Sequence, residues 1–163
     1  MTEKDIVMIL DNTETNRAIF ETYLEMQGFA VCFTPNNKQA LQTMKEVMPD
    51  MILVNMTNPL NDEFRILDDV RNDPDLSDIP SMVLATKSMP EHVEKSLRTR
   101  ADDVVVKPFD INEFLEKITR LIHSRRSQNV VVFHPKILKN RQSGIEVKFK
   151  MRTTTNPDHR VQN

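Results

Sequence analysis

Five short apolar runs recur along the first two thirds of the chain, at residues 6–10, 29–33, 51–54, 82–85 and 104–106. Their apolar residues are consecutive rather than alternating, which is typical of parallel strands buried on both faces of a sheet. The segments between these runs carry helical periodicity. We therefore predict that strand and helix alternate five times.

Two of the predicted helices have a well-defined apolar stripe. One stripe consists of Ala40, Leu41, Met44, Val47 and Met48, and the other repeats its spacing with Phe114, Leu115, Ile118, Leu121 and Ile122. Three residues mark helix boundaries. Gly28 follows the first helix (about 14–27), Pro90 begins the fourth, and Asp110 caps the last.

This pattern predicts an α/β three-layer sandwich, because parallel strands need crossover connections and these are right-handed. Five strands in this length fit the flavodoxin-like fold, with a parallel sheet of order 2-1-3-4-5 and functional groups just beyond the carboxyl ends of the strands.

The charge divides the chain into an acidic body and a basic tail. Residues 1–123 hold 13 Lys and Arg against 22 Asp and Glu, a net charge of −9, whereas residues 124–163 hold nine against two, a net charge of +7. We assign residues 1–123 to the α/β domain, 124–128 to a linker, 129–153 to a basic β-hairpin-like extension and 154–163 to a disordered tail.

The extension is expected to contain strands at residues 129–134 and 145–152. In the second of these, Lys148, Lys150 and Arg152 alternate with apolar residues and form a basic surface. Two strands alone are marginal in water, so the pair must cover the body, a second copy or a partner.

Composition excludes several classes of function. The chain has two glycines and one cysteine, which excludes a glycine-rich phosphate loop, a disulfide framework and a multi-cysteine zinc site. Its longest apolar run has five residues, too few for a membrane span. We expect a soluble, cytoplasmic protein with no membrane partner.

Three segments at the predicted strand ends carry a family resemblance. Residues 10–17 (LDNTETNR), 49–59 (PDMILVNMTNP) and 101–110 (ADDVVVKPFD) together resemble the receiver (CheY-like) domain of two-component response regulators. The resemblance covers roughly residues 4–123 and stops before the basic tail.

The resemblance implies a role for each residue at the strand ends. In the family, an aspartate ending the third strand accepts a phosphoryl group from a histidine kinase, and an acidic pair ending the first strand holds Mg²⁺. A Thr or Ser ending the fourth strand and a lysine ending the fifth contact the phosphoryl oxygens. The corresponding residues here are Asn55, the pair Asp11 and Asn12, Ala85 and Lys107.

Two further family positions follow on the fifth strand. Val104 replaces an aromatic residue that takes part in the family's switch, and Pro108 matches a proline preceded by a cis bond. Thr86 reaches the pocket only if a bulge shifts the fourth strand, so we keep Ala85 as the hydroxyl position.

These departures predict a pocket without the family's chemistry. A neutral amide is a poor nucleophile, so Asn55 should not accept phosphate; its NH₂ group can donate to Asp11 instead. Asp11 and Lys107 together carry no net charge, so we expect Mg²⁺ binding to be weak or absent, with Asp11 at most a remnant of the metal site.

We therefore predict a degenerate receiver that acts as a phosphorylation-independent protein-interaction module, with no catalytic residue and no cofactor. Its interaction face is expected to include Val104, Pro108 and Phe109, and its partners to be a histidine kinase, another regulator or a second copy. Two alternatives stay open. One is a working phosphoreceiver with an unusual acceptor. Asp62 lies in the loop after Asn55 and is a candidate, but the N-cap preference favours a role for it in capping the third helix. The other is a nucleic-acid-binding adaptor that uses the basic extension, with Phe133 and Phe149 as stacking residues.

Overall fold

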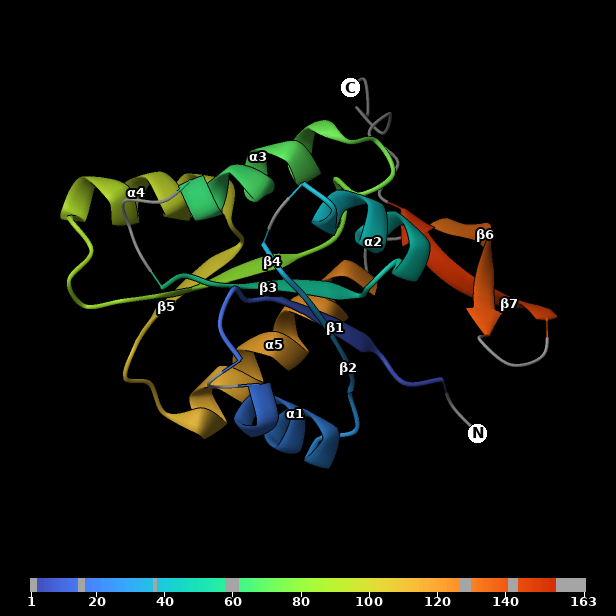
Figure 1. The fold of residues 1–163 in the computed structure, drawn as a ribbon, viewed down its shortest axis with the longest axis horizontal. Coiled ribbons are helices and arrows are strands. Elements are labelled where there is room, and N and C mark those ends of the chain that lie inside the picture. The colour runs from blue at the N-terminus through green and yellow to red at the C-terminus, as the bar shows by residue number, and fades with distance from the viewer. Residues whose placement is uncertain are drawn as a thin grey trace, which may run out of the picture.

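A computed structural model describes residues 3–14, 17–36, 38–57, 62–126, 130–140 and 144–154. Five strands form one parallel sheet in the order β2-β1-β3-β4-β5, which confirms the predicted fold and strand order (Figure 1). The strands are β1 (Ile6–Leu10), β2 (Ala30–Thr34), β3 (Met51–Asn55), β4 (Ser81–Ala85) and β5 (Asp103–Val106).

Helices cover both faces of the sheet and complete the three layers (Figure 1). They are α1 (Arg17–Met26), α2 (Ala40–Val47), α3 (Arg65–Asn72), α4 (Glu91–Arg100) and α5 (Ile111–Arg126), with a short 3₁₀ turn η1 (Asp62–Phe64) leading into α3. In the described part of the chain, no helix is long and apolar enough to cross a membrane.

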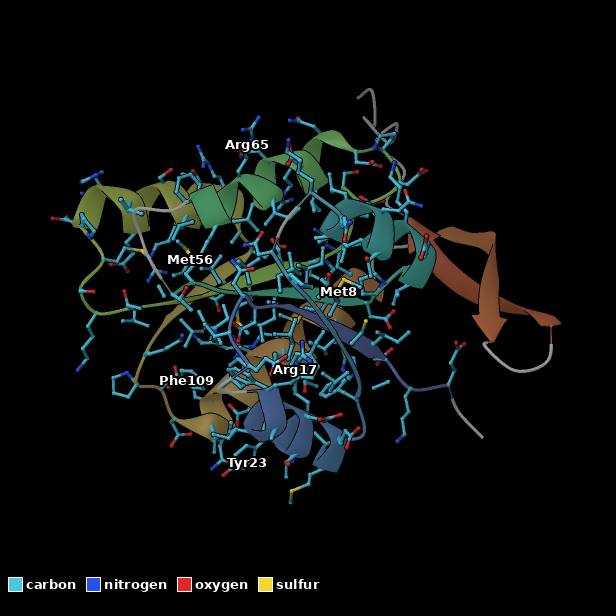
Figure 2. All side chains as sticks on the ribbon, in the orientation of Figure 1. Met8, Arg17, Tyr23, Met56, Arg65 and Phe109 are labelled. Carbon is cyan, nitrogen blue, oxygen red and sulfur yellow. The ribbon has the colours of Figure 1, made fainter. Side chains whose placement is uncertain are left out.

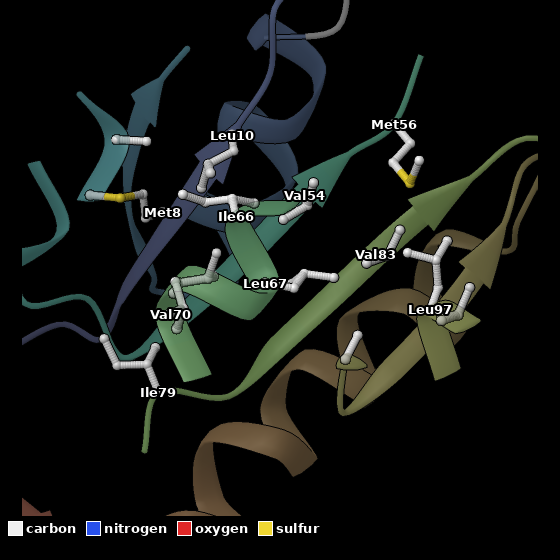
Figure 3. Packing of buried hydrophobic residues seen from close by; sticks show 14 of the residues in the cluster. Met8, Leu10, Val54, Met56, Ile66, Leu67, Val70, Ile79, Val83 and Leu97 are labelled. Atoms are coloured by element: carbon white, nitrogen blue, oxygen red, sulfur yellow. The ribbon is translucent and has the colours of Figure 1, made fainter. Parts of the chain in front are cut away.

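The core has two halves because successive residues of each strand face opposite sides of the sheet. Met8, Leu10, Val54 and Val83 pack under α2, α3 and α4 (Figure 3). Their strand neighbours pack under α1 and α5 together with Phe20, Leu24, Phe114 and Ile118. The apolar stripes predicted for α2 and α5 therefore face the sheet.

The predicted boundary residues have the expected local roles. Gly28 adopts a φ of 87° after α1, where its backbone N donates to Glu25 O at 2.9 Å and Phe29 N donates to Leu24 O at 3.0 Å. Glycine reaches this left-handed conformation without strain. At the start of α5, Asp110 Oδ1 accepts hydrogen bonds from the backbone N of Asn112 and Glu113, so it is the N-cap.

Some boundaries differ from the sequence prediction. β2 begins at Ala30 rather than Phe29, because Phe29 N closes the end of α1. β3 includes Asn55, whose register partner is Leu84. α5 continues to Arg126, so residues 124–126, which we had placed in the linker, are helical.

Two further strands, β6 (Val130–Asn140) and β7 (Gly144–Thr154), pair antiparallel and form a separate two-stranded sheet. β6 lies beside α2, and the hairpin extends away from the body on the right in Figure 1. It is longer than predicted, because β6 continues through Pro135 to Asn140, past the expected end at residue 134. Thr154, which we assigned to the tail, belongs to β7. The expected linker residues 127–128 and the rest of the tail, 155–163, lie outside the described residues.

Candidate functional site

The predicted pocket lies at the carboxyl edge of the sheet, where β1 and β3 are neighbours. Asn55 ends β3 and is 2% exposed, and Asp11 directly follows β1 and is 6% exposed. Asn55 Nδ2 donates a hydrogen bond to Asp11 Oδ2 at 2.9 Å. The contact expected from the sequence is therefore present, and it is one that two ionised carboxylates could not make.

Asp11 is held on its other side by its own loop. Asp11 Oδ1 accepts from the backbone N of Thr13 at 2.8 Å and from Thr13 Oγ1 at 2.9 Å. Both carboxylate oxygens of Asp11 are thus engaged by donors. By contrast, Asn55 Oδ1 is buried and has no hydrogen-bond partner among the described residues, so the amide is anchored through its nitrogen.

Asn12 does not join this pair. It is exposed, and its Oδ1 accepts a hydrogen bond from the backbone N of Asn36 at 2.9 Å. Asn36 follows β2 and its Nδ2 donates to the backbone O of Glu63. Asn12 therefore links the loop after β1 to the loops after β2 and β3.

The end of β4 brings no hydroxyl to the pocket. Ala85 is fully buried and pairs with Val106 in the sheet. Thr86 follows it, and its Oγ1 lies 3.2 Å from Ser88 Oγ within the next loop.

Lys107 follows β5 and is half-buried, with its Nζ 3.5 Å from the backbone O of Met56. Met56 marks this edge of the sheet in Figure 2. Burial lowers the pKa of Lys107 from 10.5, and the negative charges of Asp11 and Glu63 oppose that shift.

Glu63 is a pocket residue that sequence reasoning missed. It lies in η1, is 6% exposed, and holds Thr57 with both carboxylate oxygens. Its Oε2 accepts from Thr57 N and its Oε1 accepts from Thr57 Oγ1, each at 2.9 Å. With Glu63 included, two carboxylates and one ammonium give the pocket a net charge of −1, not the zero inferred from Asp11 and Lys107 alone.

All four carboxylate oxygens of Asp11 and Glu63 accept hydrogen bonds from within the chain. The two oxygens of Asp11 accept from Thr13 and Asn55, and those of Glu63 accept from Thr57. In the described part of the chain, no group of three or more His, Cys, Asp or Glu residues is placed to hold a metal ion.

The predicted interaction face is only partly accessible. Val104 is 3% exposed and belongs to the core beside α4, so its side chain is not available to a partner, contrary to expectation. Pro108 is exposed. Phe109 is half-buried with its ring centroid 4.8 Å from that of Phe114. A shallow pocket of about 240 Å³ lies between β5 and α5 beside these two residues.

The register of the hairpin separates the basic residues from the aromatic ones. His134 pairs with Lys150 and Val132 with Arg152, whereas Phe133 and Phe149 occupy the alternate positions. In a strand, alternate positions lie on opposite faces. The two phenylalanines therefore occupy register positions on the opposite face from Lys148, Lys150 and Arg152.

Asp62, the alternative acceptor, begins η1. Its side chain lies outside the described residues.

Comparisons with known proteins agree with this fold. A family model for the response regulator receiver domain matches residues 7–119. A probable transcriptional regulator, ycf27 of Guillardia theta, is 30% identical over 119 residues, which are 73% of this chain and 46% of that protein. The chain thus spans about half the length of the curated relatives it matches.

Solved receiver structures have the same architecture. The receiver domain of a signal transduction histidine kinase from Syntrophus aciditrophicus superposes with a TM-score of 0.65 at 25% identity, covering 74% of this chain and 91% of that one. The receiver domain of a sensor histidine kinase from Pseudomonas aeruginosa, described with a magnesium ion coordinated in its active-site cleft, has a TM-score of 0.65 at 20% identity and covers 74% and 99%.

Proposed function

The chain belongs to the response regulator receiver domain family of two-component signalling, and on that premise we propose that it is a degenerate receiver that works through protein contacts without being phosphorylated. The hydrogen bond from Asn55 Nδ2 to Asp11 Oδ2 carries this proposal. An amide at the acceptor position is a poor nucleophile, and its N–H group occupies an oxygen of the one acid that remains from the pair.

The pocket also contains an anion of its own. In the family, the lysine after the fifth strand contacts an incoming phosphoryl group. Here the carboxylate of Glu63 is held beside Thr57, and its charge acts on Lys107. We infer that Glu63 supplies the negative charge that phosphorylation would otherwise bring, so that the domain keeps one conformation.

The hydrogen bonds to Asp11 also argue against a requirement for a metal ion. To bind Mg²⁺, Asp11 would have to exchange its hydrogen bonds with Thr13 and Asn55 for metal coordination, with no second carboxylate beside it at position 12. We propose that Mg²⁺ binds weakly or not at all.

The direct test is to incubate the full chain with a small phosphodonor and Mg²⁺ and to measure its intact mass. We expect no added phosphoryl group. A labile phosphoryl adduct would overturn the proposal, and peptide mapping would then show whether Asp62 or another residue accepts it. Amide NMR gives a second readout, because neither Mg²⁺ nor a beryllofluoride phosphoryl mimic should shift resonances around Asn55 at sub-millimolar concentration.

The contact surface is proposed to lie along β5 and α5, around Pro108 and Phe109. Photo-crosslinking groups at Glu113, which lines the pocket there, and at Tyr23, which is exposed on α1 (Figure 2), distinguish this face from that of α1. Crosslinks from Glu113 to a histidine kinase or another regulator of the same cell support the assignment. Crosslinks from Tyr23 alone contradict it.

A further inference from the structure

The register of the β6–β7 hairpin divides its residues into two unlike faces. Residues directly opposite in an antiparallel pair share a face, and the next pair lies on the other face. One face, the apolar ribbon face, holds eight apolar residues among ten positions, the other two being Thr153 and Lys139 near its ends. The eight are Val131, Phe133, Pro135, Ile137, Ile145, Val147, Phe149 and Met151.

The opposite face carries most of the basic residues, together with Val130, Val132, Leu138 and Glu146. It holds Lys136, Lys148, Lys150 and Arg152 with His134, and Lys136 is directly opposite Lys148 in the register. Like charges at opposed positions repel each other, so this face is best kept in water. The hairpin thus has one face to bury and one to expose.

The body of the same chain offers no matching surface. Among its described residues, the exposed large hydrophobics are Ile19, Tyr23 and Met26, all on α1, whereas the hairpin extends from the side of α2 (Figure 1). Both faces of the five-stranded sheet are already covered by helices.

The helix nearest to the hairpin is also unsuitable. The exposed positions of α2 are polar: Gln42, Lys45 and Glu46. The apolar ribbon face therefore has no counterpart of comparable size in its own described body.

We propose that the apolar ribbon face is a self-association surface, on which the hairpin of a second copy of this chain packs face to face. The hairpin is complementary to itself in length, width and apolarity. The resulting small β-sandwich leaves the basic faces outside, where like charges stay solvated and limit further stacking.

The area is sufficient for a specific dimer. A ribbon of two eleven-residue strands is roughly 37 Å long and about 10 Å wide. When two such faces pack together, they bury on the order of 1,000 Å² of accessible surface once the uneven surface of the side chains is included. That is about the least that a specific interface buries. Self-association through this face does not depend on the state of the phosphoacceptor pocket.

Analytical ultracentrifugation of the full chain tests the proposal. We expect the mass of a dimer at micromolar concentration. Phe149→Lys and Val147→Lys each place a charge on the apolar ribbon face and should weaken the dimer at least about tenfold, because an unpaired charge would be buried. Lys148→Glu and Lys150→Glu are the matched controls from the other face of the same strand and should leave the mass unchanged.

Far-UV circular dichroism of the same variants shows whether each still folds. Phosphodonor treatment of the same variants tests the proposal for Asn55 separately from self-association. A monomeric wild type at about 100 μM, or equal dissociation by Phe149→Lys and Lys148→Glu, overturns the proposal whatever the result at Asn55. So does a monomer that binds DNA or RNA in a salt-dependent manner through the hairpin, since polyanion binding would then be its role.

Discussion

Replacing Asn55 with aspartate should destabilise the protein, although it restores the residue that the family uses. Asn55 is 2% exposed, and its Nδ2 donates to Asp11 Oδ2 at 2.9 Å. Asn55→Asp exchanges that donor for a second anion in the same buried place. The other carboxylate oxygen keeps the place of Oδ1, where no partner is present among the described residues.

The size of the effect follows from charge and hydrogen bonding. Two unit charges about 4 Å apart repel by about 4 kcal/mol at an effective dielectric constant of about 20. The lost hydrogen bond adds about 1 kcal/mol, and the ammonium of Lys107 offsets part of the repulsion. We expect the free energy of unfolding at pH 7 to fall by about 3 kcal/mol, or the melting temperature by about 10 °C.

The pH dependence identifies the cause. The pKa of the introduced carboxyl is raised in the fold above its ordinary value near 4. The folded variant therefore holds a proton more tightly than the unfolded chain. The penalty is smallest below about pH 4 and grows as the pH rises through the raised pKa.

Urea unfolding without divalent cations, at several pH values between about 4 and 8, measures this difference. Asn55→Ala is the control, because it removes the same hydrogen bond without adding a charge, and its cost should not change with pH. If Asn55→Asp matches wild type at pH 7, or shows the same pH profile as Asn55→Ala, the reasoning about this pocket is wrong.

Three further predictions test other parts of the structure. Glu63→Gln removes a negative charge that acts on Lys107, so the pKa of Lys107 should fall further below 10.5; a side-chain NMR titration that shows an unchanged or higher pKa would contradict this. Gly28→Ala meets no atom within 4 Å but places a side chain at a φ of 87°, so it should cost about 1 kcal/mol from backbone strain alone, with Gly28→Asn less harmful in the same urea assay. Asp102→Ala removes the acceptor for the backbone N of Ser81 at 2.8 Å and should cost about 1–2 kcal/mol, whereas Asp102→Asn should retain most of that stability; equal losses would refute a hydrogen-bonding role.

The strands, their order and the contact between Asn55 and Asp11 could be predicted because they depend on periodic burial and on strand ends meeting at one edge. Glu63 could not, since a loop acid has no periodic signal. Its burial depends on the 3₁₀ turn that returns it to Thr57. The only local hint was an acidic residue six positions after a hydroxyl.

The C-terminal strands show the same limit. Alternation identified the apolar and basic positions of β7 but not how far β6 extends, because Pro135 removes a backbone donor and is normally a break. The register with β7 continues through that position, where Pro135 pairs with Phe149. Pairing between strands, which no single strand encodes, determines the extent of the hairpin.

The chain of contacts from Asn12 through Asn36 to Glu63 and Thr57 also has a mechanical consequence. It joins the connections after β1, β2 and β3 into one hydrogen-bonded brace along the carboxyl edge of the sheet. A protein that binds and displaces any one of these connections will therefore also displace the other two. Engineering a responsive receiver from this scaffold would have to begin by loosening the brace, before any nucleophile is reinstated.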